Sequence, residues 1–401
     1  AGQLTFNLNQ VNPEATPDSS SIAEALDAIG SVSGRRLINL GSGDYSFANR
    51  LTLNTNVEIE GAGAVNTTLS ALGSYRHFDV NAGVAVTLRN LTLTTSGLAA
   101  GQRGGGIENT GQLTVEGVHF VDNRATNGGA ITSHQVSPLN PALLTIVDSE
   151  FRENTAGRDG GALTSWRSAI ISFENATLSQ NQANNLGGAL FLSDSSFVDV
   201  ETSTFGDNQA ASGGGIFFSS SSSGTLSNTL FSSNVAIDDG GAIVSYGAAL
   251  AISGGSQFIG NTADDSGGAL ALRSGTVQLD DVLIEGNSAL RSGGGITTWD
   301  GNTLSTNNTV IRANQSSEDG GGLAIVDSTY TSVNITIEDN GAIAANPNDL
   351  HGGGLFSYNS QITLDNSTVR NNTAARDGGG LHSVDSAVNK VGSLFDGNTA
   401  T

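Results

Sequence analysis

The sequence contains no cysteine and no methionine, and Lys390 is its only lysine. The absence of cysteine excludes disulfides and thiolate metal sites. The formal net charge is −22, so the chain lacks the basic face that phosphate binding needs, and nucleic acid is not an expected partner. No apolar run approaches the roughly 18 residues of a membrane helix, so no membrane-spanning segment is expected.

Proline is also scarce, with 5 residues, whereas glycine is abundant, with 54. This combination argues against a disordered Pro/Gly linker and favours many tight, repeated turns. Hydrophobic residues make up 37% of the chain, which is enough for a long core.

The first region, residues 1–34, combines a short strand with the only convincing helix. Leu4, Phe6 and Leu8 alternate with polar residues, which predicts an edge strand. The helix is predicted to start at Ser21 as its N-cap, with Glu24 as capping-box partner, and to end at Gly30 or Gly34. We expect it to cover the open end of a solenoid.

Residues 35–103 are expected to form about three irregular first coils of that solenoid. Short β segments alternate there with clusters of Gly, Asn and Ser that indicate turns. The expected strands are Leu37–Leu40, Leu51–Leu53, Val57–Ile59, Val84–Leu88 and Leu91–Leu93.

Residues 104–401 repeat one pattern, Phe-x-x-Asn-x-Ala followed by Gly-Gly-Ala/Gly-Ile/Leu. A representative copy runs from Phe258 to Leu270. Eleven copies of the asparagine occur, at positions 123, 154, 181, 208, 234, 261, 287, 314, 340, 372 and 398. The closing Ile/Leu also occurs eleven times, at 107, 131, 163, 190, 216, 243, 270, 296, 323, 355 and 381.

A period near 27 residues, without helices between the strands, excludes leucine-rich, ankyrin and tetratricopeptide repeats. We therefore predict an all-β fold: a single-stranded right-handed parallel β-helix with three strands per coil, about 14 coils and a short N-terminal capping helix. The Phe and the closing Ile/Leu would point inward. The Asn would bridge coils through its amide and form the corner through its tolerance of left-handed backbone. The paired glycines would allow positive φ or close approach.

The Phe-x-x-Asn and Gly-Gly-Ala-Ile motifs at this spacing resemble the repeat of the chlamydial-type polymorphic outer membrane proteins. The resemblance covers residues 104–401, and the first coils resemble those of pectate-lyase-like parallel β-helices. It implies a β-helical region of an extracellular or cell-surface protein, often one associated with adhesion.

Acidic residues gather just before several Gly-Gly pairs. Stacking would bring carboxylates of adjacent coils to within about 5 Å, close enough for Ca²⁺ or an acid/base pair. The candidates for catalysis are Asp238, Asp239, Asp264, Asp265 and Arg291, and those for calcium are Asp238, Asp239 and Asp265. The alternative is a solvated turn, and Arg291, aligned between Asp265 and Glu318, favours a charge-alternating ladder over a catalytic cluster.

An aromatic column is predicted three residues after each closing Ile/Leu, together with aromatics one residue after it. If strand alternation holds, both sets face outward and suit glycan stacking or protein contact. The candidate ligand or partner residues are Trp166, Tyr246, Trp299, Tyr358, Phe191 and Phe217. The alternative is partial burial, or coverage by two insertions at His134–Ala142 and Gly341–His351. The five histidines share no spacing, which argues against metal or triad chemistry.

Two function classes follow. The favoured one is a non-catalytic, secreted or cell-surface structural or adhesive β-solenoid whose partners are other subunits or extracellular glycans. Because no polar cap is evident after Asn398, exposed strand edges predict end-to-end self-assembly into filaments. The alternative is a pectate-lyase-like polysaccharide lyase or hydrolase that uses the Asp cluster. No cofactor other than calcium is expected.

Overall fold

The computed structural model describes residues 4–8, 19–30, 35–71, 73, 75–95, 101–343 and 350–401. The chain is almost entirely β and forms a right-handed parallel β-solenoid of about 13 turns with one short helix, which confirms the predicted fold class. It divides into two compact units, residues 1–185 with 189–198 and residues 186–188 with 199–401. The boundary lies within β23 (Phe197–Glu201).

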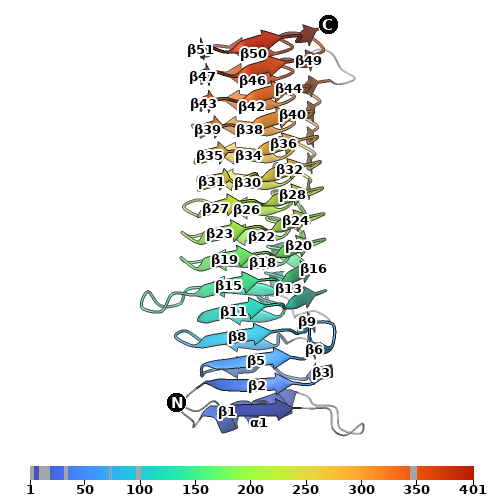
Figure 1. Ribbon diagram of the computed structural model, residues 1–401, viewed down its shortest axis with the longest axis vertical. Helices are drawn as coiled ribbons and strands as arrows, with labels where there is room; N and C mark the ends of the chain where they lie inside the picture. The colour runs from blue at the N-terminus through green and yellow to red at the C-terminus, as the bar shows by residue number, and fades with distance from the viewer. Residues whose placement is uncertain are drawn as a thin grey trace. The chain divides into compact units, whose positions relative to one another are not determined.

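A regular turn passes in chain order through four parallel sheets, here called C, A, B and D. Sheets A, B and C contain the three predicted strands of each turn. Sheet D is an addition to the prediction, because most of its strands have only two residues and follow the Asn corner, as Thr262–Ala263 does. Within each unit, strands of successive turns lie one above the other (Figure 1).

The first unit contains strands of all four sheets. Sheet A is formed there by β1 (Leu4–Leu8), β2 (Arg36–Leu40), β5 (Val57–Gly61), β8 (Ala85–Arg89), β11 (Gln112–Glu116), β15 (Leu143–Val147) and β19 (Ile170–Glu174). Sheet B is formed by β3 (Gly43–Phe47), β6 (Thr67–Ala71), β9 (Thr92–Thr95), β12 (His119–Val121), β16 (Glu150–Arg152) and β20 (Thr177–Ser179). Sheet C is formed by β4 (Leu51–Leu53), β7 (Phe78–Val80), β10 (Ile107–Asn109), β14 (Ile131–His134), β18 (Leu163–Trp166) and β22 (Leu190–Leu192). Sheet D is formed by β13 (Arg124–Asn127), β17 (Thr155–Asp159) and β21 (Gln182–Ala183).

The second unit repeats the same order with more regular spacing. Its sheet A strands are β27 (Ser223–Ser227), β31 (Ala249–Ser253), β35 (Thr276–Asp280), β39 (Thr303–Asn307), β43 (Thr329–Val333), β47 (Gln361–Asp365) and β51 (Ala387–Val391). Sheet B contains β24 (Thr204–Gly206), β28 (Leu230–Ser232), β32 (Gln257–Ile259), β36 (Leu283–Glu285), β40 (Val310–Arg312), β44 (Thr336–Glu338), β48 (Thr368–Arg370) and β52 (Leu394–Asp396). Sheet C contains β26 (Ile216–Phe218), β30 (Ile243–Tyr246), β34 (Leu270–Arg273), β38 (Ile296–Trp299), β42 (Leu323–Val326), β46 (Leu355–Tyr358) and β50 (Leu381–Val384). Sheet D contains β25 (Gln209–Ala210), β29 (Val235–Ala236), β33 (Thr262–Ala263), β37 (Ser288–Ala289), β41 (Gln315–Ser316), β45 (Gly341–Ala342), β49 (Thr373–Ala374) and β53 (Thr399–Ala400).

The one helix among the described residues, α1 (Ser19–Gly30), lies against the first strands of the first unit (Figure 1). Its buried Ile22 and Ala25 cover apolar surface there, as predicted for a capping helix. The predicted N-cap at Ser21 is wrong, because the helix begins two residues earlier and Ser21 lies inside its first turn. It ends at Gly30 as predicted, whereas Gly34 lies outside the described residues.

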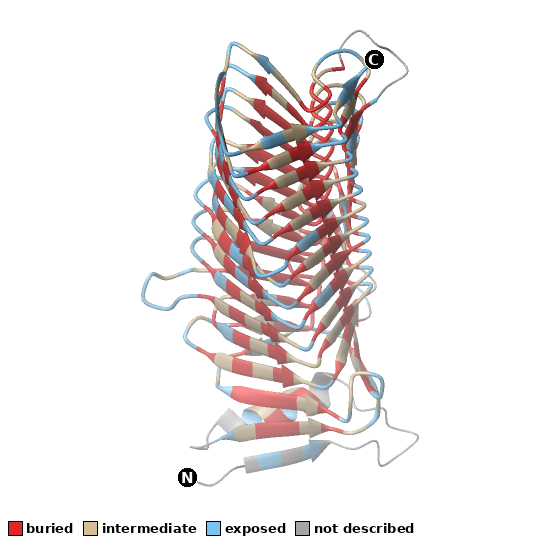
Figure 2. Cartoon of the chain, turned by 45° about the horizontal axis from the view of Figure 1, so that its top comes forward, coloured by how far each residue is buried: buried red, intermediate tan, exposed pale blue. Residues whose placement is uncertain are grey.

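The apolar core is a set of ladders of identical or similar side chains. In sheet B, the Phe120 and Phe151 rings stack with centroids 4.6 Å apart in the first unit, and Phe231 and Phe258 stack at 4.8 Å in the second. All four are fully buried. Buried and exposed residues alternate along the strands (Figure 2), so each strand turns one face inward and one outward.

The repeated asparagines form a buried ladder of hydrogen bonds at the corner between sheets B and D. Asn234 Nδ2 donates to Asn261 Oδ1 at 2.9 Å, and the backbone N–H of Asn234 donates to the same oxygen at 3.0 Å. Asn261 Nδ2 in turn donates to Asn287 Oδ1 at 2.9 Å and to the carbonyl of Phe231 at 3.0 Å. Each amide therefore satisfies buried groups on two other turns, which confirms the predicted bridging role.

The predicted left-handed backbone at the asparagine itself is wrong. The residue before each asparagine adopts positive φ instead, as Ser233 does at 54° and Ala313 at 54°. The asparagine does not need the left-handed conformation, because its side chain, rather than its backbone, completes the corner. The glycine pair behaves as expected: Gly240 has φ 66°, and a Cβ on Gly241 would lie 2.2 Å from the carbonyl oxygen of Gly268.

Asn261→Ala is expected to destabilise the protein strongly. It leaves the backbone N–H of Asn234 and the carbonyl of Phe231 without their side-chain partner in a buried site. Since each unsatisfied buried group costs about 1–3 kcal/mol, we expect a loss of about 3 kcal/mol or more, measured by denaturant unfolding followed by circular dichroism. The exposed Gln257→Ala serves as the control and should change stability by less than about 0.5 kcal/mol. Equal effects of the two substitutions would contradict the role of the ladder.

Candidate functional site

The candidate site lies on the outer face of sheet C in the first unit. Leu163 and Leu190 at the starts of β18 and β22 are fully buried, so the residues one and three positions later face outward. In-register pairing places Thr132 beside Thr164, and His134 beside Trp166. Side chains from neighbouring turns are thereby gathered into columns on one surface.

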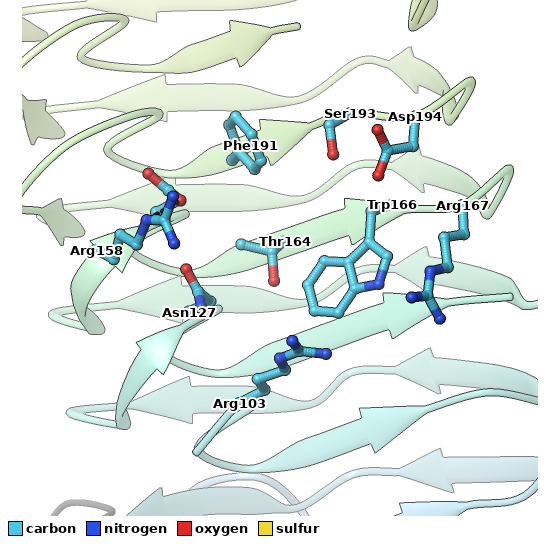
Figure 3. A pocket seen from close by; sticks show the side chains of 10 residues that line it. Arg103, Asn127, Arg158, Thr164, Trp166, Arg167, Phe191, Ser193 and Asp194 are labelled. Atoms are coloured by element: carbon cyan, nitrogen blue, oxygen red, sulfur yellow. Dashed lines mark ion pairs between the residues drawn. The ribbon is translucent and has the colours of Figure 1, made fainter. Parts of the chain in front are cut away.

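An open hollow of about 350 Å³ lies over this surface (Figure 3). Its lining residues include Arg103, Arg158, Trp166, Arg167, Phe191 and Asp194. The indole of Trp166 occupies the middle of the hollow, with Arg103 and Arg167 close to it and Phe191 on the next turn. The hollow therefore combines one large aromatic surface with three guanidinium groups in a strongly acidic chain.

Trp166 makes one cation–π contact and one ring-stacking contact. The Arg103 guanidinium carbon lies 4.6 Å from the centre of the indole, and the His134 ring stacks on the indole at 4.9 Å with a 20° interplanar angle. Cation–π contact positions Arg103 without neutralising its charge. Trp166 itself remains only half-buried, so part of its ring is open to solvent.

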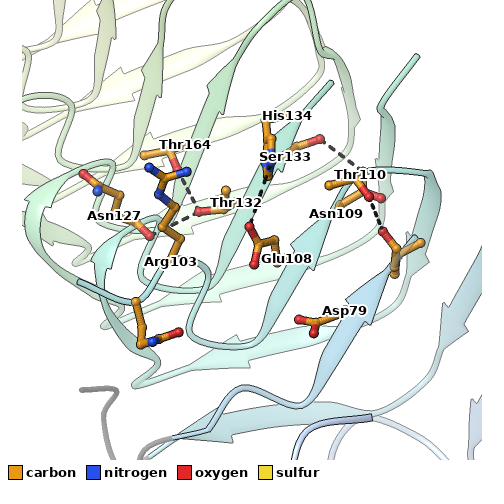
Figure 4. A network of polar contacts seen from close by, with 12 residues as sticks. Asp79, Arg103, Glu108, Asn109, Thr110, Asn127, Thr132, Ser133, His134 and Thr164 are labelled. Atoms are coloured by element: carbon orange, nitrogen blue, oxygen red, sulfur yellow. Dashed lines mark hydrogen bonds and ion pairs between the residues drawn. The ribbon is translucent and has the colours of Figure 1, made fainter. Parts of the chain in front are cut away.

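A polar network lies beside the hollow on the preceding turns (Figure 4). Arg76, which is 5% exposed, pairs with Asp79 at 3.2 Å and with Glu108, and its guanidinium also donates to the backbone carbonyl of Arg103. Because Glu108 and Asp79 are register partners on adjacent strands, one buried guanidinium contacts both carboxylates. This network anchors the backbone that carries Arg103.

Burial shifts the pKa of two groups in this region. Desolvation, reinforced by the charges of Arg103, Arg167 and Arg76, lowers the pKa of His134 to about 4, so the imidazole is neutral at physiological pH. Its 4.0 Å approach to Glu108 is therefore not an ion pair under those conditions. Burial also raises the pKa of Asp79, an effect that Arg76 and Arg50 oppose.

The remaining predicted aromatic residues are distributed over both units and lie on the outer face. Phe191 is half-buried in the first unit. In the second unit Phe217 and Trp299 are half-buried, whereas Tyr246 and Tyr358 are about 40% exposed. Arg273 pairs in register with both Tyr246 and Trp299 and lies over the Tyr246 ring at 5.1 Å. Their role in ligand or partner binding stays a prediction.

The insertion at His134–Ala142 lies beside the hollow rather than over it. Gln135, Val136, Ser137 and Pro138 border a second small hollow together with Arg167. Leu139 in this insertion is 88% exposed. The second insertion, at Gly341–His351, falls largely outside the described residues, since 344–349 are not described.

The predicted acidic candidates lie in the second unit. Arg291 contacts Asp265 at 3.4 Å and Glu318 at 3.6 Å, which is the geometry of a charge-alternating ladder. Ser266 links Asp239 to Asp265. The backbone N–H of Ser266 donates a hydrogen bond to Asp239 at 3.3 Å, and the Ser266 hydroxyl donates one to Asp265 at 3.0 Å. Two further candidates are exposed, Asp238 and Asp264.

No group of three or more His, Asp or Glu among the described residues is arranged to hold a metal ion. The proposed calcium ligands Asp238, Asp239 and Asp265 therefore do not form such a group. No helix in the described part of the chain is long and apolar enough to cross a membrane.

Sequence reasoning missed the arginines around Trp166. Arg103 lies in the irregular coils, whereas Arg158 precedes the Gly160-Gly161 pair and Arg167 follows the strand after it. Two signals were available. Ten of the fifteen arginines precede residue 168, and Arg167 occupies a turn position where later repeats have Asp194, Gly247 or Asp300.

Comparison with known proteins supports the repeat and the fold. The Chlamydia polymorphic membrane protein repeat matches residues 228–246, which confirms the resemblance at that repeat. A comparison with curated proteins finds no match. Among solved structures, a mannuronic acid specific polysaccharide family 6 lyase from human gut microbiota is similar with a TM-score of 0.53 and 9% identity, covering 90% of this chain and 86% of the other. The Agl-KA catalytic domain is similar with a TM-score of 0.50 and 14% identity, covering 98% of this chain and 69% of the other. At these identities the likeness shows the parallel β-helix fold alone.

Protein stability should depend on the protonation of Asp239. Burial first, and the charge of Asp265 second, raise the pKa of Asp239 to about 6 from 3.8. Because the pKa is higher in the folded state, the protonated Asp239 side chain stabilises the fold relative to the ionised one. This contribution is complete below pH 3.8 and is lost as the pH rises through about 6. Asp239→Asn should therefore raise stability by on the order of 1–3 kcal/mol at pH 7.5 and leave it unchanged at pH 3.5, measured as Tm at both pH values. The control Asp264→Asn removes an exposed charge one turn away and should give equal Tm differences at both pH values. An Asp239→Asn difference independent of pH would contradict the assignment.

Proposed function

We propose that the protein is an extracellular or cell-surface β-helix that binds a glycan chain without cleaving it. The observation that carries the proposal is the half-exposed Trp166 indole in an open hollow on a flat, in-register outer face. An indole presents a large apolar surface to the C–H face of a sugar ring at little conformational cost. The Phe191 side chain, which pairs in register with Thr164 on the next turn, adds a second aromatic surface to the same hollow.

The surface location rests on the repeat. The matched repeat is named for polymorphic membrane proteins of Chlamydia, and a location on the cell surface is what it suggests for this chain. Adhesion through the bound glycan, and end-to-end assembly into filaments, are further parts of the proposal. Negative-stain microscopy of purified protein at several concentrations tests the latter, because filaments should lengthen with concentration and single particles should not.

Trp166→Ala should weaken retention of the protein by its glycan. We expect binding to weaken by about tenfold or more, since base- or sugar-sized rings stacked on an aromatic side chain contribute about 1–3 kcal/mol. The measurement is affinity electrophoresis in gels containing soluble polysaccharides, with Tm as a check that the fold is intact. Tyr75→Ala, an exposed aromatic outside the hollow, is the matched control and should migrate as the unmodified protein does. Retention that survives Trp166→Ala would contradict the proposal.

A second candidate function is polysaccharide cleavage at the acidic ladder. It is favoured by one observation: the pKa of Asp239 is raised to about 6, the range in which a carboxyl group can donate a proton to a leaving sugar oxygen. The fold is compatible, since one similar solved structure is a mannuronic acid specific lyase.

Incubation with acidic polysaccharides distinguishes the two functions. If the ladder is catalytic, new reducing ends or unsaturated products appear, and Asp239→Asn lowers their rate by at least about a hundredfold, the usual contribution of a positioned acid or base. Arg312→Gln, which removes a paired guanidinium elsewhere in the second unit, is the control for altered surface charge. Binding without any product, in the unmodified protein, excludes cleavage of that polymer.

A further inference from the structure

The arginines around Trp166 differ from the other arginines of the chain in their partners. Twelve of the fifteen have a carboxylate within 4.0 Å. Arg36 bonds Thr55 and Asn56 instead. Among the described residues, Arg103 and Arg167 have no carboxylate within that distance, and both line the hollow around Trp166. The two guanidinium groups without a carboxylate partner therefore flank a single indole.

Three arginines and two aspartates, Asp159 and Asp194, line the hollow, so its local charge is positive and opposite to that of the chain. Asp159 lies 3.2 Å from the third arginine, Arg158, and balances its charge. Asp159 also accepts a hydrogen bond from Asn185 at 2.9 Å. Arg103 is held by its cation–π contact, which leaves its N–H groups free to bind an anion. A chain of net charge −22 repels anions over most of its surface, so two unneutralised guanidiniums mark the place where an anion is attracted.

Arg167 is also held in an unfavourable backbone conformation. Its φ is 56°, in the left-handed region, where a residue with a Cβ and a long side chain is disfavoured. In seven of the eight later repeats the corresponding residue is also left-handed and is short or lacks a side chain: Asp194, Gly247, Ser274, Asp300, Asp327, Asn359 and Asp385. Arginine at this one turn therefore costs stability that the sheet does not require, which is the pattern of a residue retained for binding.

We propose that the hollow binds an anionic glycan, with Trp166 stacked on a sugar ring and Arg103 and Arg167 paired with carboxylate or sulfate groups of that chain. The inference rests on the proposed glycan-binding function and names the chemistry of the ligand. Planar guanidinium groups match the geometry of both anions and can form two parallel hydrogen bonds to either. An indole flanked by two guanidinium groups suits a charged sugar. The indole contacts the apolar face of the sugar ring, and the guanidinium groups bind the anionic substituent of that ring.

The test compares polymers that differ only in charge. Polygalacturonate is compared with its carboxyl-reduced form, and dextran sulfate with dextran, by affinity electrophoresis or calorimetry with the intact protein. We expect at least one anionic polymer to bind about tenfold or more tightly than its neutral partner, since a hydrogen bond to a charged group contributes about 1.5–3 kcal/mol. Raising the salt concentration from 20 to 300 mM should weaken this binding. Preference for one anionic polymer identifies the carboxylate or the sulfate as the group bound.

Two substitutions test which arginines cause the preference for the anionic polymer. Arg103→Gln and Arg167→Asn should each reduce binding of the anionic polymer about tenfold and leave binding of the neutral one unchanged. Arg167→Asn should also raise Tm, because asparagine tolerates positive φ, so its loss of binding cannot be attributed to unfolding. The control is Arg312→Gln, whose guanidinium is paired with Glu285 at 2.9 Å and which should leave binding of both polymers unchanged.

The outcomes separate this inference from the proposed function. Equal binding of charged and neutral polymers, lost in Trp166→Ala, overturns the anionic ligand but keeps glycan binding. Anionic binding that survives the double substitution of Arg103 and Arg167 also overturns the inference, because the charge selectivity then lies elsewhere. If the unmodified protein binds none of the polymers, the proposed function fails together with the inference drawn from it.

Discussion

The structure depends above all on the buried asparagine amides at the corner after sheet B. A tight corner leaves backbone N–H and carbonyl groups pointing into a space that the core closes to water, and each such group needs a partner. The carboxamide of Asn261 supplies both an acceptor and a donor, and it does so to turns on either side of its own. The interaction is satisfied only when successive turns are in register, so the same amides that close the corner also fix the pairing of the strands.

Fixed register has a consequence for the outer surface. Because the turns of each unit are aligned by their buried asparagines and phenylalanines, an outward side chain has a predetermined neighbour on the next turn. His134 meets Trp166, and Arg273 meets Trp299, for this reason alone. Changing an outward residue does not disturb the inward ladders. A binding site can therefore be assembled from a few substitutions on two or three adjacent turns while the core motif stays the same.

The sequence was informative where periodicity determines structure. The repeat predicted the parallel β-helix, the inward Phe120 and Phe151, and the amide ladder, because side chains that recur at one period must stack on each other. Sheet D and the start of α1 were not predicted, since two-residue pairing and the choice between neighbouring serines depend on contacts that no local pattern encodes. The left-handed residue before each asparagine was also missed, because residues as different as Ser233 and Ala313 occupy it.

The candidate site was predicted only in its aromatic part. Trp166 follows from strand alternation, whereas Arg103 reaches it from an irregular coil whose course is set by the buried Arg76 and its two carboxylates. Arg158, Arg291 and Arg103 are chemically equivalent in the sequence. They differ in the structure because Arg158 pairs with the adjacent residue Asp159 and Arg291 pairs with Asp265 on the preceding turn, while Arg103 faces an indole. The role of an arginine on this surface thus depends on the side chain that it faces. An arginine that faces aspartate stabilises a surface ladder, and an arginine that faces tryptophan keeps its charge available for a ligand.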